Sequence, residues 1–396
     1  MKVLVVSFYY PPEMGAAPSR ISNMAEGLKQ QGADVDVLTC LPNYPKGRIF
    51  EGYRRCLSKK ETINGINIHR YWTYATVSKN PFARLLGMLF FAFDIWIYIL
   101  KPFKVRHYDK VIIQSPPLLV SFSATLLFRC LYRKKTVLNV SDLWPQSALE
   151  LGAIKSGGLY HKVLLWMERF VYKHNWAYQG QSQEIINHIE SFGYNKPHFL
   201  YRNLQPDLNF ESKPVGKRIP FKLVYAGLLG VAQDILGIIK HINFKEINAE
   251  LHIFGGGNQA DDIQKYVDSN DCGVICHGFK AKDELNQLLG SFHASIVPLA
   301  VPIKGAVPSK IYDLLPHGTP ILFCGGGEGE QIILEHHLGL VSQPGNYDQL
   351  RDNIRLLERL SDTDYCSFRQ NCLTASQTTF SFNKQMESFL LFLQGL

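Results

Sequence analysis

The chain has 396 residues, of which 46% are apolar, so it is long enough for two domains that each bury a hydrophobic core. The net charge of +8 is unevenly placed. Residues 1–205 hold 26 lysine and arginine residues against 13 acidic ones, whereas residues 206–396 hold 16 against 21. A basic N-terminal half suggests contact with anionic lipid or a phosphorylated acceptor. No nucleic-acid-binding motif is present, so we expect no nucleic-acid partner.

The N-terminal half begins with a strand–helix–strand pattern. Residues 2–8 are a continuous apolar run typical of a buried strand, and a proline-rich loop over 9–18 follows. A helical pattern over 19–31 and a short strand over 35–38 complete the unit, which favours a parallel sheet. Further elements are predicted as strands over 110–114 and 136–140 and as helices near 118–132 and 158–173.

A strongly apolar segment covers residues 82–103. Between positions 85 and 100 only Gly87 and Asp94 interrupt the apolar run, which is shorter than the ~20 residues that a spanning helix needs. Basic residues flank the run on both sides, namely Arg84, Lys101, Lys104 and Arg106. An ordinary core helix is one interpretation. We favour a helix at the membrane interface, whose cationic flanks reach the headgroups.

The C-terminal half repeats the alternation of strands and helices. Short apolar strands are predicted over 222–226, 249–254, 273–276, 294–297 and 320–323. The polar stretch over 205–217 is a predicted linker, which gives two doubly wound α/β domains, 1–205 and 206–380, facing a cleft. An amphipathic helix near 383–393 ends the chain.

The segment from Pro308 to Asp313 follows one of these strands and has the residues of an anion site. Ser309 has the side chain of a helix N-cap, and a helix start presents unpaired amides and a positive dipole, to which Lys310 adds a full charge. Asp313 shares a face with these residues. Amides with an ammonium suit a diphosphate, and a carboxylate suits ribose hydroxyls. The alternatives are a nucleotide-sugar site and a capped helix with a surface Lys–Asp pair.

Five motifs together resemble the retaining glycosyltransferases of family four over nearly the whole chain. The Pro-Pro-Glu loop that ends at Gly15, followed by Arg20, resembles the glycine loop that approaches the donor diphosphate. Residues 140–145 (VSDLWP) resemble a signature of bacterial transferases for capsule, O-antigen and colanic-acid sugars, nearest to the branch with the N-acetyl-L-fucosamine transferases. In the C-terminal half, the matching segments are the opening loop 225–233, the strand-then-glycine segment 251–257 and the base-contacting turn 277–279.

The resemblance implies a GT-B fold, in which the last helix, within residues 381–396, packs on the first domain. It implies transfer of a sugar from a UDP-sugar with retention, without a metal or other cofactor; an N-acetylated or deoxy amino sugar is one candidate. Lys310 would stabilise the leaving diphosphate, and Asp142 would orient or deprotonate the acceptor hydroxyl. The residues expected to bind the nucleotide-sugar are Gly15, Gly227, Gln233, Gly255, Gly278, Phe279, Val307, Pro308, Ser309, Ile311 and Asp313.

The chain departs from the family pattern in the donor site. The family has two glutamates eight positions apart; here the second corresponds to Asp313 and the first to Gly305, so one carboxylate is absent. Gln233 stands where relatives carry a phosphate-binding lysine. Lys310 is therefore the best remaining cation for the diphosphate.

Several other residues are expected to be structural. Asp34 and Asp36 form a DxD pair at the start of a strand, which we interpret as structural rather than metal-binding. Ser141 replaces the histidine that many relatives have before Asp142, and Pro316 is expected to shorten or kink the helix after Asp313. The eight cysteines include no CxxC pair, so we expect reduced thiols.

The location and the acceptor follow from the N-terminal half. The apolar run at the N-terminus is too short for a signal-peptide core, so we expect a cytoplasmic protein. The basic half and the apolar helix predict a peripheral enzyme on the inner face of the cell membrane that extends a polyprenyl-diphosphate-linked glycan. A nicotinamide-dependent oxidoreductase would need a G-x-G-x-x-G after the first strand, which is missing. A membrane-surface scaffold that lost its chemistry stays open, because the first glutamate is absent.

Overall fold

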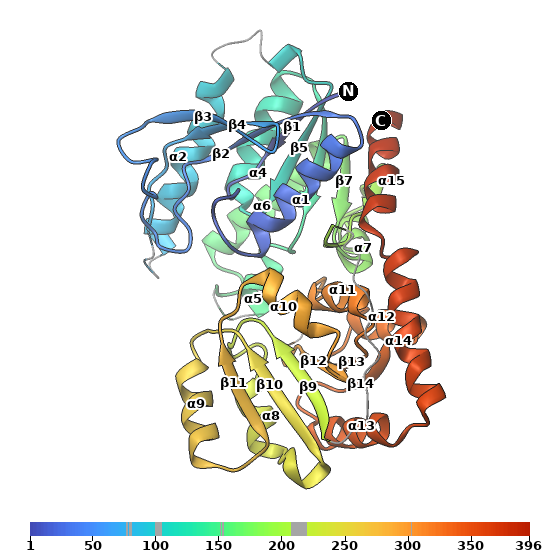
Figure 1. Ribbon diagram of the computed structural model, residues 1–396. Helices are drawn as coiled ribbons and strands as arrows, with labels where there is room; N and C mark the ends of the chain where they lie inside the picture. Colours follow the sequence, from blue (N-terminus) through green and yellow to red (C-terminus); the bar gives the residue numbers. More distant parts are fainter. Residues whose placement is uncertain are drawn as a thin grey trace. The chain divides into compact units, whose positions relative to one another are not determined.

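The computed structural model describes residues 1–76, 78, 81–99, 105–150, 152, 154–206, 220–301 and 303–396. Within them the chain forms two compact units, each with its own sheet (Figure 1). The N-terminal domain comprises Met1–Pro206 and Phe382–Leu396, and the C-terminal domain comprises Asp207–Ser381. Most of the expected linker, and both Lys101 and Lys104, lie outside the described residues. Two separate sheets confirm the α/β architecture of two Rossmann-like domains.

The sheet of the N-terminal domain has the strand order β3-β4-β2-β1-β5-β6-β7-β8. All neighbours are parallel except β3, which runs antiparallel to β4. The strands are β1 (Lys2–Val6), β2 (Asp34–Cys40), β3 (Ser58–Ile63), β4 (Ile66–Tyr71), β5 (Lys110–Ser115), β6 (Lys135–Val140), β7 (Ala177–Gly180) and β8 (His198–Leu200). The continuous apolar character of β1 follows from burial on both faces of the sheet.

Helices flank this sheet. They are α1 (Ala16–Gln30), α2 (Pro81–Ile99), α4 (Leu118–Ala124), α5 (Gln146–Glu150), α6 (Leu159–His174), α7 (Gln183–Glu190) and α15 (Phe382–Gly395). α4 continues as a π-helical segment over Thr125–Leu131, so the helices predicted near 118–132 and 158–173 are confirmed. α2, α4 and α6 pack side by side over the core, whereas α15 packs on α1. None of the helices in the described part of the chain combines the length and the apolar character needed to cross a bilayer.

The C-terminal domain has a six-stranded parallel sheet in the order β11-β10-β9-β12-β13-β14. Its strands are β9 (Phe221–Ala226), β10 (Ala249–Phe254), β11 (Val274–Gly278), β12 (Ala294–Pro298), β13 (Ile321–Cys324) and β14 (Gly339–Ser342). The helices are α8 (Ile235–His241), α9 (Ala260–Ser269), α10 (Lys282–Leu289), α11 (Lys310–Leu314), α12 (Glu328–Glu335), α13 (Tyr347–Arg359) and α14 (Asp362–Gln377). Five of the six strands were predicted, and β14 was not. In such sheets, ligands bind beyond the carboxyl ends of the strands.

Candidate functional site

Glycine turns follow the carboxyl ends of β9, β10 and β11, and hydrogen bonds hold them together. The amide of Gly227 donates to the carbonyl of Phe254 at 2.8 Å, and the amide of Leu229 donates to the carbonyl of Gly256 at 2.9 Å. The amide of Gly255 donates to the carbonyl of Gly278 at 2.8 Å. The structure therefore gathers Gly227, Gly255 and Gly278 at one edge of the sheet, although they are separated in sequence.

Two of these glycines are required by close approach. A Cβ atom on Gly255 would lie 1.8 Å from the carbonyl oxygen of Gly227. A Cβ atom on Gly227 would lie 2.3 Å from Nζ of Lys310. Both residues also have positive φ angles, 143° and 151°, which side chains disfavour. Any other residue at either position would displace the turn or the lysine.

Lys310 lies against this edge. Its Nζ donates to the hydroxyl of Tyr225 at 3.1 Å and is 4.4 Å from the centre of the Tyr225 ring. The Tyr225 hydroxyl in turn donates to the carbonyl of Leu228 at 2.5 Å. Burial lowers the pKa of Lys310 to about 8, although Asp313 opposes the shift. A desolvated ammonium held beside glycine turns is well placed to pair with an anionic ligand.

Asp313 is the second charged group of this segment. Burial raises its pKa to about 6, while Lys282 and Lys310 act in the opposite direction. Its buried Oδ1 has no hydrogen-bond partner within the protein. A buried carboxylate oxygen without a donor is costly, so this atom is suited to accept a hydrogen bond from a bound ligand.

The expected cap at Ser309 is wrong. Ser309 precedes α11, but its side chain makes no capping bond, because its backbone is already helical at φ −59° and ψ −21° and a capping residue needs an extended backbone. The carbonyl of Ser309 instead accepts from the amides of Tyr312 and Asp313 at 2.9 and 3.0 Å. The expected effect of Pro316 is confirmed, since α11 stops at Leu314 and a 3-10 turn over Leu315–His317 contains the proline.

The other residues expected in the donor site fall into two groups. Val307 and Ile311 are buried in the core. The helix start was expected to offer several unpaired amides to a ligand. Pro308 has no amide proton, and the amide of Ile311 donates to the carbonyl of Pro308 at 3.1 Å, so fewer amides are free than predicted. By contrast, Phe279 is 83% exposed directly after the Gly278 turn. Gln233 is half-buried, and its Oε1 atom is buried without a hydrogen-bond partner.

Gly305 stands at the position of the first family glutamate. Gly305 is buried and has a φ of 80°, a left-handed conformation that a glutamate would adopt only with strain.

A histidine pair lies beside the Gly278 turn and was not expected from the sequence. Nδ1 of His252 is 2.9 Å from Nε2 of His277, and the two rings stack at 5.2 Å. His277 also stacks on Phe254 at 4.4 Å. The two histidines meet because they lie on the adjacent strands β10 and β11, and no local sequence motif predicts this contact.

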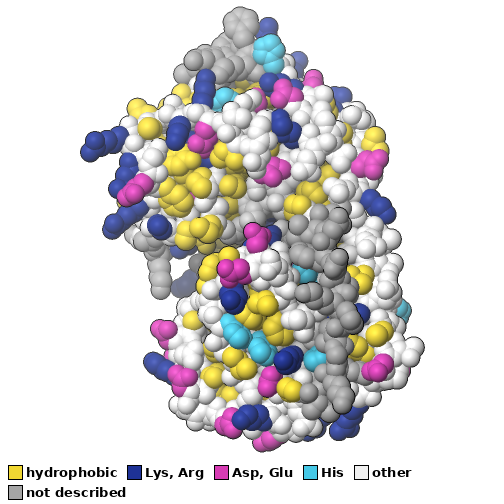
Figure 2. All heavy atoms as spheres, viewed as in Figure 1, with side chains coloured by type: hydrophobic (Ala, Val, Ile, Leu, Met, Phe, Trp, Pro, Cys, Tyr) yellow, Lys and Arg dark blue, Asp and Glu magenta, His cyan; other side chains and the backbone are white. Residues whose placement is uncertain are grey.

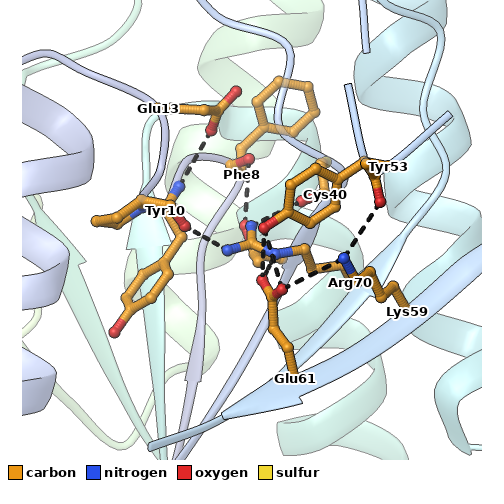
Figure 3. Close-up of polar contacts among 11 residues, drawn as sticks. Phe8, Tyr10, Glu13, Cys40, Tyr53, Lys59, Glu61 and Arg70 are labelled. Carbon is orange, nitrogen blue, oxygen red and sulfur yellow. Dashed lines mark hydrogen bonds and ion pairs between the residues drawn. The ribbon is translucent and has the colours of Figure 1, made fainter. Parts of the chain in front are cut away.

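In the N-terminal domain, two buried charged side chains fix the loop before Gly15 (Figure 3). Glu13 accepts from the amides of Tyr10, Asn43 and Tyr44 at 3.2, 2.9 and 2.9 Å. Burial raises the pKa of Glu13, while these amides lower it.

Arg70 holds the same loop from the other side. It is fully buried, donates to the carbonyl of Pro11 and pairs with Glu61. Gly15, with a φ of 140°, then begins α1. The anchoring roles of Glu13 and Arg70 were not predicted from the sequence.

Arg20 and Asp142 form the charged group at the carboxyl ends of β1 and β6. Arg20 is 7% exposed and donates from Nη1 to Oε1 of Gln181 at 3.1 Å, whereas its buried Nε has no partner. Asp142 keeps an exposed surface and accepts from the Ser141 hydroxyl at 3.3 Å. Desolvation by the surrounding walls raises the pKa of Asp142, and Arg20 opposes this. Ser141, in the place of the family histidine, therefore contacts the carboxylate directly.

A pocket of about 690 Å³ opens beside this group and lies entirely in the N-terminal domain. Arg20, Ser141 and Asp142 line it together with side chains from α2, α4 and α6. Its volume falls within the roughly 300–1,000 Å³ of ordinary ligand pockets.

The DxD pair at the start of β2 serves the fold. Asp34 and Asp36 both pair with Nζ of Lys2, at 3.1 and 3.5 Å, and Asp36 accepts from the Tyr108 hydroxyl at 2.6 Å. In the described parts of the chain, no group of three or more histidine, cysteine or acidic side chains is arranged to hold a metal ion.

The chain is similar to known glycosyltransferases in sequence and in structure. Residues 15–198 match the family described as "Glycosyl transferase 4-like domain". The chain is 28% identical over 157 residues to the putative colanic acid biosynthesis glycosyl transferase WcaI of Escherichia coli (strain K12), covering 40% of this chain and 38% of WcaI. It is 24% identical over 325 residues to the probable glycosyltransferase WbjE of Pseudomonas aeruginosa, covering 78% and 79% of the two chains.

Solved structures of low identity share the fold. Anabaena Alr3699/HepE, solved in complex with UDP, is 13% identical, covers all of both chains and has a TM-score of 0.72. WaaG, a glycosyltransferase involved in lipopolysaccharide biosynthesis, is 12% identical over the same full coverage with a TM-score of 0.63. Both are GT-B structures, so the expected GT-B fold is confirmed.

Proposed function

We propose that this chain, a glycosyltransferase with the GT-B fold and a match to a glycosyl transferase 4-like domain over residues 15–198, uses a UDP-sugar as its donor. It transfers the sugar to a lipid-linked glycan acceptor with retention of configuration. The observation that carries this proposal is the desolvated ammonium of Lys310, packed on Gly227 at the edge where three glycine turns meet. The acceptor is a polyprenyl-diphosphate-linked glycan of a surface polysaccharide, in line with the names of WcaI and WbjE.

The donor is bound by the C-terminal domain. The diphosphate of the UDP-sugar lies against the turns at Gly227 and Gly255, where no side chain keeps it from the backbone. Lys310 neutralises the charge that develops on the leaving diphosphate as the glycosidic bond breaks. Asp313 accepts a hydrogen bond from the ribose through its unpartnered Oδ1. The turn at Gly278 and Phe279 contacts the base.

The acceptor hydroxyl is held in the N-terminal domain. Asp142 is the exposed carboxylate at the carboxyl end of β6, and it orients the hydroxyl or accepts its proton. Desolvation raises the pKa of Asp142, which makes its carboxylate a stronger base, while Arg20 opposes this shift.

The membrane supplies the acceptor. Among the described side chains of α2, the exposed hydrophobic ones are Leu86, Leu89, Phe90, Phe93, Trp96 and Ile97. Figure 2 shows hydrophobic side chains gathered on the N-terminal domain with lysine and arginine side chains near them. Cations near anionic lipid contribute about 1 kcal/mol each, so a few give reversible attachment. We therefore place the enzyme on the cytoplasmic face of the membrane as a peripheral protein.

The test is the release of UDP from a panel of UDP-sugars, with and without a membrane fraction that carries lipid-linked glycan. Release that depends on one sugar and increases with the acceptor supports the proposal. Absence of both UDP binding and UDP release across the panel contradicts it and favours the scaffold.

A further inference from the structure

The walls of the 690 Å³ pocket are almost entirely hydrocarbon. Of its twenty lining residues among those that the structure describes, thirteen are Ala, Val, Leu, Met, Pro or Trp, and only Arg20 and Asp142 are charged. The neutral polar side chains at its inner end are already paired. The Ser7 hydroxyl donates to the carbonyl of Tyr9 at 2.8 Å, and Nε2 of Gln114 donates to the Ser141 hydroxyl at 2.9 Å. Apart from the Asp142 carboxylate, a sugar ring would find few free partners for its hydroxyls in this lining.

One end of the pocket is marked by a buried cation with an unused donor. Arg20 is 7% exposed, and its Nε is buried without a partner. A buried guanidinium donor without an acceptor is unfavourable, and an anionic oxygen would satisfy it. The pocket thus combines a hydrocarbon wall with one guanidinium that can bind an anion. Such a lining suits an amphiphilic ligand rather than a wholly apolar one.

The other end opens onto exposed apolar surface. Leu89 of α2 and Val163 of α6 both line the pocket and are 45% and 44% exposed. Tyr160 lines it too and is half exposed. Because Leu89 also belongs to the exposed apolar face of α2, the pocket adjoins this face, and a chain leaving a lipid surface can enter it there.

We propose that this pocket holds the hydrocarbon chain of the lipid acceptor, an isoprenyl diphosphate, with its anionic link at Arg20. The proposal rests on the proposed function, because it assumes that the acceptor is a lipid diphosphate. It adds the site at which the lipid is recognised, through α2, α4 and α6.

Binding of farnesyl diphosphate to the full chain tests this, measured by titration calorimetry with saturating UDP so that the donor site is occupied. Inorganic diphosphate and farnesol are the comparison ligands. We expect farnesyl diphosphate to bind about tenfold or more tightly than either one, because only it offers both the chain and the anion.

Variants of the pocket sharpen the test. Met88→Trp places a larger side chain in the pocket and should weaken the binding of farnesyl diphosphate about tenfold. The matched control is Leu86→Trp, on the same helix at a residue that is exposed and does not line the pocket. Val163→Trp, at the half-exposed mouth, serves if Met88→Trp does not fold.

Three outcomes overturn the proposal: equal binding of farnesyl diphosphate and inorganic diphosphate, unchanged binding in the filled variants, and equal weakening in Leu86→Trp. In parallel with the binding measurements, the release of UDP from UDP-sugars is measured without any lipid. Normal UDP release with no preference for the isoprenyl chain removes the pocket assignment alone. Tight binding of the isoprenyl chain without any UDP binding or release removes the proposed transfer and leaves the lipid site.

Discussion

Lys310 gives the sharpest test of the proposed transfer at the scale of one side chain. Lys310→Ala removes the ammonium beside Gly227, and we expect kcat to fall about 10²–10³-fold, as when one charge-stabilising donor is lost at a reacting oxygen. The melting temperature should stay close to that of the wild type, because the desolvated ammonium contributes little to folding. UDP release and thermal melting measure the two effects.

The matched control is Lys265→Ala, on an exposed position of α9. It should leave turnover unchanged. Near-normal turnover in Lys310→Ala, or an equal loss in both variants, would remove Lys310 from the mechanism.

The same group predicts the pH dependence of the reaction. Because burial lowers the pKa of Lys310 to about 8, the free enzyme loses this positive charge as the pH rises through about 8. Because burial raises the pKa of Asp313 to about 6, the carboxylate is lost as the pH falls through about 6. We expect kcat/KM to be largest between these values and to fall on both sides. In Lys310→Arg, which retains its charge, the fall of kcat/KM at alkaline pH should disappear. If the fall is unchanged, a group other than Lys310 causes it.

Sequence reasoning reached Lys310, Asp313 and Gly227 because each lies in a short local motif. It did not predict the contact between Lys310 and Tyr225, nor the contact that anchors the loop before Gly15. Tyr225, which accepts from Nζ of Lys310, is 85 positions away, and Arg70 lies 59 positions from its partner Pro11. Such pairs arise from the strand order of a sheet, which no local pattern specifies.

The glycine turns can be tested at the scale of the elements. Gly255→Ala places a methyl group 1.8 Å from the carbonyl oxygen of Gly227, which forces the turns after β9 and β10 apart. We expect a loss of about 1–3 kcal/mol in the free energy of unfolding, with weaker UDP binding. Gly256→Ala is the control, because nothing lies within 4 Å of its added Cβ atom. Equal effects of the two substitutions on unfolding and UDP binding would show that close approach is not the cause.

The anchor of the loop before Gly15 gives a second prediction at this scale. Arg70→Met leaves Glu61 without its buried partner and the carbonyl of Pro11 without its donor. Loss of one member of a buried ion pair costs about 3–5 kcal/mol, so denaturant unfolding should show a large decrease. Lys59→Ala removes only a partly exposed partner, 3.8 Å from Glu61, and should cost about 0–1 kcal/mol. A small effect of Arg70→Met would mean that the loop is held by Glu13 alone.

Periodicity found the long helices and the buried strands, because their patterns are continuous over many residues. It missed the β3–β4 hairpin, because its first strand, SKKETI, is polar except for Ile63 and lies at the edge of the sheet. A signal was nevertheless present, since Asn64 and Gly65 form the turn with φ angles of 51° and 72°, as the usual two-residue hairpin turn requires.

For the whole molecule, the division of charge and of exposed apolar surface gives the last prediction. Phe93 of α2 is 65% exposed. Phe93→Ser should weaken binding to liposomes of mixed anionic and zwitterionic lipid about tenfold, because the free energy gained by burying one such side chain in the bilayer is lost. Leu356→Ser, at a 50% exposed position of α13 in the acidic C-terminal domain, is the control and should bind as the wild type. Binding should also weaken at high salt, because headgroup attraction is screened. Absence of binding at low salt, or equal loss in the control, would contradict attachment through the N-terminal domain.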